Sequence, residues 1–186
     1  DFAELITKPL VAIVGSRKVS PYGQAVTTKL AAALARAGVV IVSGLALGVD
    51  SIAHRAALEA GGQCLAVLPT SPDRIYPASH NQLAKQIVAQ GGALVSERPP
   101  NNETPQKWQF IARNRIIAAI SQGVVITEAA VRSGSLHTAN FALEQGLDVF
   151  AVPGNITSST SEGTNNLIKT GATPVTNATD VLEPLG

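Results

Sequence analysis

Short apolar runs alternate along the chain with segments whose apolar residues recur at helical spacing. Each run is four to six residues long, and most end at Gly, Ser or Pro, which is typical of strands buried on both faces of a parallel sheet. The predicted strands are Val11–Gly15, Val39–Gly44, Cys64–Pro69, Ala93–Ser96, Val124–Thr127 and Val149–Val152.

The segments between these strands carry helix signals. Ser20 is a suitable cap and Pro21 suits the first helical position, while Gly38 follows the last apolar residue of the same helix. Further helices are predicted at 49–60, 79–90, 105–121, 136–145, 165–169 and 178–182, with proline-rich loops at 70–78 and 97–104. The alternation predicts an α/β fold, an extended Rossmann-like, doubly wound and mostly parallel sheet with helices on both faces.

Composition limits the domain count and the cellular setting. The 186 residues are 45% hydrophobic but only 4% aromatic, so we expect one Rossmann-like domain over residues 1–186 with an aliphatic core. No apolar run approaches the roughly 18 residues that a membrane helix needs, and no signal peptide is visible. We therefore expect a cytoplasmic protein without a membrane partner, and its single cysteine, Cys64, is expected to be a buried thiol.

Charge is distributed unevenly, although the net charge is only +1. Five basic residues and no acidic ones lie between Leu5 and Val49, namely Lys8, Arg17, Lys18, Lys29 and Arg36. The segment from Arg98 to Arg132 holds five more basic residues against two acidic ones. The two zones are expected to converge into a local positive patch, whereas a uniformly basic binder is excluded.

Glycine- and serine-rich turns follow several predicted strands. They are Gly15-Ser16-Arg17-Lys18, the turn from Ser43 through Gly44 to Gly48, Ser133-Gly134-Ser135 with Arg132 beside it, and Pro153-Gly154-Asn155. The carboxyl ends of parallel strands meet at one edge, where ligands bind in such sheets. Arginine suits phosphate and a helix N-terminus favours an anion, so these turns predict a phosphate-binding crevice.

Several enzyme classes lack their signatures. The first turn is not G-x-G-x-x-G and no acid ends the second strand, so a dinucleotide is not expected; neither a Walker A sequence nor a G-x-S-x-G elbow occurs. The three histidines lie apart, without metal-ligand spacing, so no metal or cofactor is expected. Asp50 and Glu128 are interpreted as groups that orient backbone turns, with a catalytic carboxylate pair as the alternative.

The segment Lys107–Ile117 combines basic and aromatic residues most densely. Lys107 and Phe110 are three residues apart and share a helix face, which offers a cation for a phosphate and a ring for an unpaired base. Trp108 is equally compatible with a core position or with a cover over the helix end. One of Arg113 and Arg115 is expected to be a buried partner of Glu97 or Glu128.

These residues together resemble the DprA family, also called Smf, of DNA-processing proteins. The resemblance runs from about Lys8 to Leu182 and includes Gly15-Ser16-Arg17, Ser43–Asp50, Phe110 with Arg113–Ile117, Glu128–Ala130 with Ser133–Leu136, Val149–Gly154, and Gly163–Ile168 with Gly171-Ala172. It implies single-stranded DNA binding and loading of the recombinase RecA in natural transformation and DNA recombination, without catalysis. It also implies a homodimer through the region Asn165 to Leu182.

The resemblance assigns DNA contacts to Arg17, Lys107, Phe110 and the Ser133–Ser135 turn. With the turn residues and basic side chains beside them, the candidate DNA-binding set is Gly15, Ser16, Arg17, Lys18, Gly44, Gly48, Lys107, Phe110, Arg113, Arg115, Ser133, Gly134 and Ser135. Many relatives carry proline where this chain has Ile111, so the bend that proline would introduce is not implied here. The N-terminal helical domain and the C-terminal winged helix usual in the family are not recognisable, so an excised core is expected.

Two other functions share the predicted crevice. A phosphoribohydrolase of the same Rossmann-like group would place a glycine-rich turn and an acid after a late strand, but here Glu128 precedes Ser133-Gly134-Ser135 instead of following it. A sensor of a free nucleotide would use the same pocket. Release of free base from nucleoside monophosphates would identify the enzyme.

Overall fold

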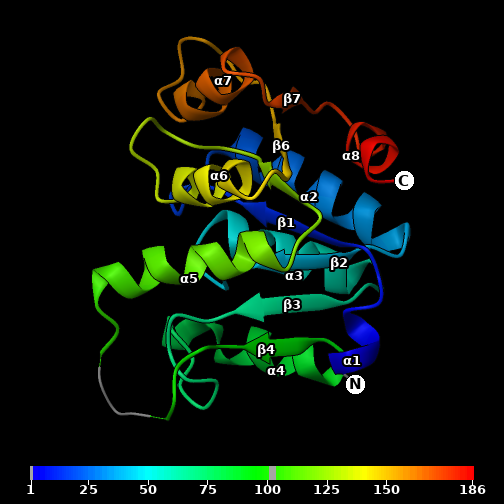
Figure 1. Cartoon of the computed structure of the whole chain (residues 1–186), viewed down its shortest axis with the longest axis vertical. Helices are drawn as coiled ribbons and strands as arrows, with labels where there is room; N and C mark the ends of the chain where they lie inside the picture. Colours follow the sequence, from blue (N-terminus) through cyan, green and yellow to red (C-terminus); the bar gives the residue numbers. More distant parts are fainter. Residues whose placement is uncertain (1, 101–103) are drawn as a thin grey trace.

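Seven parallel strands form one sheet at the centre of the molecule (Figure 1). The structure is a computed structural model that describes residues 2–100 and 104–186, so part of the predicted 97–104 loop lies outside the described residues. The strands are β1 (Leu10–Val14), β2 (Val40–Ser43), β3 (Cys64–Val67), β4 (Ala93–Val95), β5 (Gly123–Ile126), β6 (Asp148–Ala151) and β7 (Thr173–Pro174). Their order across the sheet is β4-β3-β2-β1-β5-β6-β7, and every pairing is parallel.

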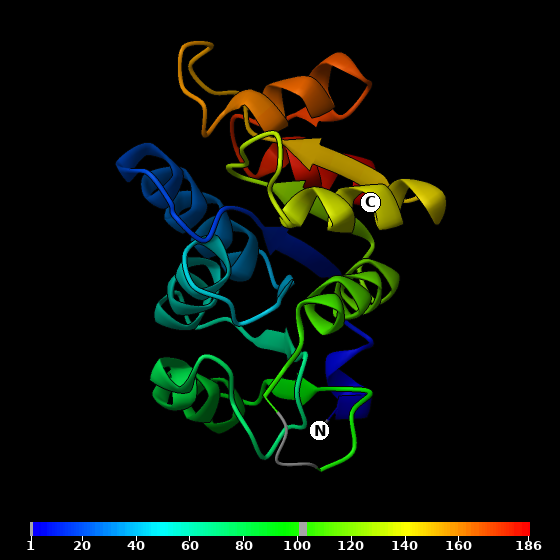
Figure 2. The same cartoon turned by 90° about the vertical axis from the view of Figure 1, so that its left-hand side faces the viewer.

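Helices cover both faces of the sheet, which confirms the predicted fold class. They are α1 (Phe2–Leu5), α2 (Pro21–Arg36), α3 (Val49–Glu59), α4 (Asn81–Ala89), α5 (Lys107–Ala119), α6 (Ser135–Glu144), α7 (Glu162–Lys169) and α8 (Thr179–Leu185), with a 3-10 turn at Ala78–His80. Figure 2 shows α2, α3 and α4 on one face and α1, α5 and α6 on the other. Each face has its own apolar core, and the central strand β1 is buried along its whole length.

Local signals account for where several elements begin and end. The Ser20 hydroxyl accepts a hydrogen bond from the Gly23 amide at 3.1 Å, and Pro21 opens α2, as the sequence predicts. Helix α5 begins two residues later than predicted and then runs through Ile111 without interruption. Two short elements, α1 and β7, were not predicted, because four and two residues are too few to show a period.

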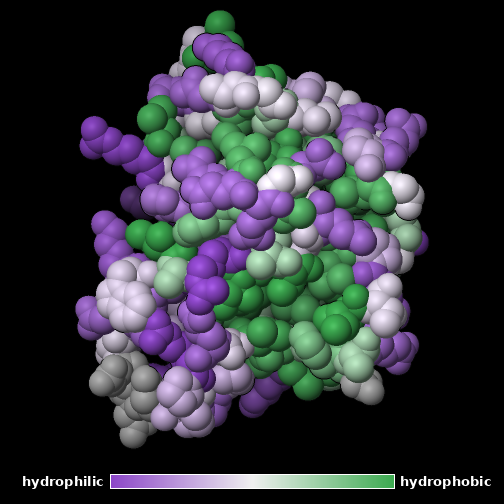
Figure 3. All heavy atoms as spheres, in the orientation of Figure 1, coloured by the Kyte–Doolittle hydropathy of each residue, from purple (hydrophilic) through white to green (hydrophobic). Residues whose placement is uncertain are grey.

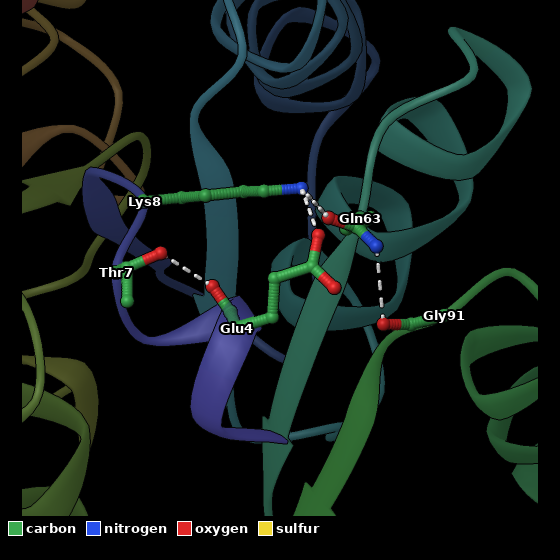
Figure 4. Close-up of polar contacts among 5 residues, drawn as sticks. All are labelled: Glu4, Thr7, Lys8, Gln63 and Gly91. Carbon is green, nitrogen blue, oxygen red and sulfur yellow. Dashed lines mark hydrogen bonds and ion pairs between the residues drawn. The ribbon is translucent and has the colours of Figure 1, made fainter. Parts of the chain in front are cut away.

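A polar cluster fastens the N-terminal segment to the amino ends of β3 and β4 (Figure 4). The Lys8 ammonium donates to Gln63 at 2.8 Å and lies 4.0 Å from Glu4, while the Gln63 amide donates to the Gly91 carbonyl at 3.1 Å. Lys8 therefore lies at the edge of the sheet opposite to the strand ends where the site is expected, and it does not join the predicted positive patch.

The face of the sheet that carries α1 and α5 is covered incompletely. Figure 3 shows apolar side chains gathered on this face over β3, β4 and α1. Phe2 and Ile6 are about half exposed there, and Ala93 and Val95 are only partly buried. In the described part of the chain, no helix is long and apolar enough to cross a membrane.

Candidate nucleic-acid interface

A cleft of about 880 Å³ lies at the carboxyl edge of the sheet, the edge that faces the viewer in Figure 2. Its floor is formed where β1 and β5 end, and its walls come from α5, α6 and the loop that contains Tyr76. The chain leaves β1 toward β2 on one side, whereas β5 lies on the other side. This is the topological switch point, where open parallel sheets bind their ligands.

Three side chains from distant parts of the sequence form a stack in this cleft. The Arg17 guanidinium lies over the Phe110 ring, 5.0 Å from its centroid. Tyr76 meets the same ring edge to face, with centroids 5.4 Å apart. An exposed cation over a ring contributes about 0.5–1 kcal/mol, which is enough to favour one position of the flexible arginine. The free protein therefore presents a planar cation on an aromatic support.

Positive charge predominates along the cleft. Arg17, Lys18, Lys107 and Arg132 all line it, all are exposed, and none forms an ion pair within the residues that the structure describes. Among the described lining residues, Asp50 supplies the one carboxylate, and it is 6% exposed. A cleft of this kind attracts polyanions.

The turn that carries Arg17 is held in shape by hydrogen bonds. The Ser16 amide donates to the Glu128 carbonyl at 2.8 Å, and the Ser16 hydroxyl is bonded to both the amide and the carbonyl of Lys18. Gly48 lies directly behind this turn with a φ of +77°, and a Cβ at that position would lie 2.3 Å from the Ser16 carbonyl oxygen. Only glycine therefore allows the two turns to approach this closely.

Arg113 lies at the floor of the cleft and is almost completely buried. It is 4% exposed, and its guanidinium donates to the backbone carbonyls of Gly44, at 2.7 Å, and Val67. Its Nε donates to the Asn114 side chain at 3.1 Å. A Cβ on Gly44 would lie 2.5 Å from Arg113, so the glycine makes room for this side chain. Arg113 thus connects the ends of β2 and β3 to helix α5.

Asp50 is the acidic counterpart of Arg113. Burial raises the pKa of Asp50, although the Arg113 charge and the backbone N–H groups of Ala46 and Gly44 act in the opposite direction. Burial likewise lowers the pKa of Arg113 to about 10, opposed by the Asp50 charge, so Arg113 remains charged at neutral pH. The carboxylate of Asp50 accepts from the Gly44 amide at 3.0 Å, which confirms that Asp50 orients a turn.

Glu128 has the same orienting role at the start of α2. Its side chain is 2% exposed and accepts a hydrogen bond from the Ser20 amide at 2.8 Å. The prediction that Glu97 or Glu128 would hold a buried arginine is therefore wrong. Glu97 pairs with Arg115 on the surface, and the buried arginine, Arg113, lies with Asp50 and backbone carbonyls. Every residue has a backbone carbonyl, so the sequence does not show which carbonyls will bond a buried arginine.

The turn at Ser133, Gly134 and Ser135 forms the opposite wall and leads into α6. The hydroxyls of Ser133 and Ser135 lie 2.8 Å apart, and the Asn114 amide donates to the Gly134 carbonyl at 3.3 Å. In the first turn of α6 the amides of Leu136 and His137 donate to the carbonyls of Ser133 and Gly134, at 3.1 and 3.2 Å. The turn therefore presents its hydroxyls and the positive end of the helix dipole to the cleft.

Ten of the thirteen predicted residues line the cleft, and Gly44, Gly48 and Arg115 do not. The two glycines support neighbouring turns, as described above, and Arg115 is engaged by Glu97. Arg132, the neighbour of the Ser133 turn in the sequence, lines the cleft as well. Tyr76, Asn114, His137 and Thr160 also line it and were not predicted; Tyr76 lies in a loop without a motif. Among the described residues, no group of three or more His, Cys, Asp or Glu side chains could hold a metal ion.

Comparison with known proteins identifies the family. The family described as DNA recombination-mediator protein A matches residues 3–186. Protein Smf of Escherichia coli is 49% identical over 94% of this chain, and DNA processing protein DprA of Streptococcus pneumoniae is 45% identical over 96%. The chain spans 46% and 62% of the length of these two proteins.

Solved structures give the same result. The crystal structure of DprA from Streptococcus pneumoniae is similar with a TM-score of 0.89 and 45% identity, covering 97% of this chain and 62% of the other. DprA from Helicobacter pylori, whose structure was described for its single-stranded DNA binding mode, has a TM-score of 0.86 and 38% identity over 98% of this chain and 82% of its own. The molybdenum cofactor carrier protein of Chlamydomonas reinhardtii, 17% identical with a TM-score of 0.64 over 96% of this chain and 98% of its own, shares the fold alone. This chain belongs to the DNA recombination-mediator protein A family, the family of the DprA and Smf DNA-processing proteins.

Proposed function

We propose that this domain binds single-stranded DNA in the cleft between β1, β5, α5 and α6, without a catalytic step. The observation that carries the proposal is the stack of Arg17 on Phe110, surrounded by exposed cations that have no ion-pair partner among the described residues. Single-stranded DNA needs both elements, since its phosphates require charge and its unpaired bases require a flat surface. The binding described for the Helicobacter pylori relative agrees with this assignment.

In this proposal different exposed residues contact the phosphates and the bases. Lys18, Lys107 and Arg132 neutralise phosphates, while a base extends the Phe110 stack by lying on the Arg17 guanidinium. The Ser133–Ser135 turn offers its hydroxyls and the positive end of the α6 dipole to a further phosphate. Arg113 holds the floor, and Arg115 stays with Glu97 outside the cleft.

Both carboxylates near the cleft are engaged with the backbone. Asp50 accepts from the amides of Gly44 and Ala46, and Glu128 accepts from that of Ser20. Such groups suit a rigid binding floor better than the proton transfers of a phosphoribohydrolase.

The proposal also covers two properties of the whole protein, transfer of the strand to RecA and dimerisation. The chain spans about half the length of protein Smf of Escherichia coli. We propose that, in the whole protein, the bound strand is passed to RecA in the cytoplasm, and that the protein forms a homodimer through the region Asn165 to Leu182. That region contains most of α7, all of β7 and the first half of α8, at the β7 edge of the sheet, away from β4.

Fluorescence anisotropy with labelled oligothymidylate and with duplex DNA tests the proposal. We expect tighter binding to the single strand and a decline with added salt, because phosphate contacts release counterions. Arg17→Ala and Lys107→Ala should each weaken binding, and Lys107→Ala should also reduce the salt slope by about 0.7, because it removes one phosphate contact. Lys29→Ala is the matched control, since Lys29 is exposed on α2 outside the cleft. Equal affinity for duplex, or no effect of Arg17→Ala, would overturn the proposal, and free base released from nucleoside monophosphates would replace it with the enzyme.

A further inference from the structure

A second cation lies over a second aromatic ring on the outer side of α5. The Arg98 guanidinium lies 4.6 Å from the centroid of the Trp108 ring. The arrangement repeats that of Arg17 and Phe110 two residues further along the helix, where the distance is 5.0 Å. Trp108 is not part of the cleft lining, but its neighbour Lys107 is. The second pair therefore lies just beyond the rim of the cleft.

In the Arg98–Trp108 pair the tryptophan is more exposed than a packing contact would require, whereas Arg98 is partly buried. Trp108 is 56% exposed, and Arg98 forms no ion pair within the described part of the chain. The preceding residue, Glu97, already ties this loop to α5 through Arg115. The loop therefore has an attachment to α5 besides the Arg98–Trp108 pair, and the Trp108 ring is open to a ligand.

We propose that Arg98 and Trp108 form an outer stacking platform for the DNA strand where it leaves the cleft past Lys107. The inference rests on the proposed function, because it extends the same strand by a further base. That base stacks against the Trp108–Arg98 pair, and the Arg98 charge faces the adjoining phosphate. Oligonucleotides long enough to reach the platform should then bind more tightly than those that only fill the cleft.

Trp108 is the only tryptophan of the chain, so its fluorescence reports directly on the platform. Oligothymidylates of about 4 to about 16 nucleotides, the range of single-strand site sizes, are titrated into the wild type. We expect short oligomers to bind without quenching and longer ones to quench Trp108 and to bind about tenfold more tightly. Absence of quenching at every length would overturn the platform.

Affinity measurements on variants separate stacking from loop fixation. Trp108→Ala should abolish the gain with length and leave binding of short oligomers unchanged, whereas Trp108→Phe should retain most of the gain. Glu97→Gln is the matched control, because it weakens the other attachment of the loop and should keep the gain. A loss in Trp108→Ala that is equal for short and long oligomers would overturn the inference in favour of a structural role. If short oligomers fail to bind the wild type, it is the proposed function itself that fails.

Discussion

His54 should make the stability of this domain sensitive to acid. Its side chain is fully buried in α3, and neither ring nitrogen has a hydrogen-bond partner among the described residues. Burial, together with the positive charges of His80 and Arg113, lowers the pKa of His54 from 6.5 to about 3. The ring is therefore neutral in the folded protein throughout the range in which the unfolded chain becomes protonated.

The direction and size of the effect follow from proton binding. Below about pH 6.5 the unfolded chain takes up a proton at His54, while the folded protein does so only near pH 3, so stability falls as the pH falls through this window. Each pH unit costs about 1.4 kcal/mol. At pH 4.5 the expected loss from this residue is therefore about 2.7 kcal/mol, a large fraction of the roughly 5–15 kcal/mol that holds a domain folded.

Urea unfolding at several pH values between about 7.5 and 4.5 measures this loss, as the difference in the free energy of unfolding between the wild type and His54→Leu. His54→Leu removes the titrating ring at similar volume, so any cost of its changed shape shifts the whole curve by a constant. The contributions of other groups cancel between the two curves, and the wild type should lose about 2.7 kcal/mol more than His54→Leu toward the acid end. His137→Gln, at an exposed position, should keep the wild-type slope. Parallel curves for wild type and His54→Leu would refute the reasoning.

Two further predictions concern the support of the cleft. Gly48→Ala should lower the free energy of unfolding by roughly 1–3 kcal/mol and also weaken DNA binding, because the new Cβ would displace the Ser16 carbonyl. Gly61→Ala is the control, since Gly61 also has a positive φ but has open space around it, and this variant should lose stability alone. Equal DNA affinity of the two variants would contradict the prediction. Arg113→Met should destabilise by roughly 3–5 kcal/mol, measured by the same unfolding, because Asp50 and the carbonyls of Gly44 and Val67 lose their buried partner. A loss below about 1 kcal/mol would show that the Arg113 contacts contribute little.

The sequence predicts the elements of this fold well because their signals are local. An apolar run buried on both faces, such as β1, or a cap such as Ser20 with Pro21, is recognisable from its own residues. The turns at the strand ends are equally local, and the parallel topology then brings them to one edge. This explains why Arg17 and Ser133, which are far apart in sequence, could be placed at the same edge, whereas Phe110 on α5 was assigned to the site by the family resemblance.

The burial of individual side chains could not be predicted, because it depends on contacts that the sequence does not reveal. Arg113 and Arg115 are two residues apart in one motif, yet one is buried and the other exposed, and the α5 pattern does not distinguish them. Arg113 is held by backbone carbonyls, which any residue carries. Similarly, a glycine that admits a ligand cannot be told from one that admits a neighbouring side chain, and Gly44 proves to be the second kind.

The site therefore consists of two layers with different sensitivities to substitution. The lower layer consists of Gly44, Asp50 and Arg113, which are buried, and Gly48, which is partly buried. Its polar groups bond to one another and to the backbone. The upper layer, with Arg17 over Phe110, is open to solvent and leaves its cations without ion-pair partners within the described residues. Changes in the lower layer must alter stability and binding together, because the turns move. Changes in the upper layer should alter binding alone, so the ratio of the two effects assigns a residue to its layer without a structure of the complex.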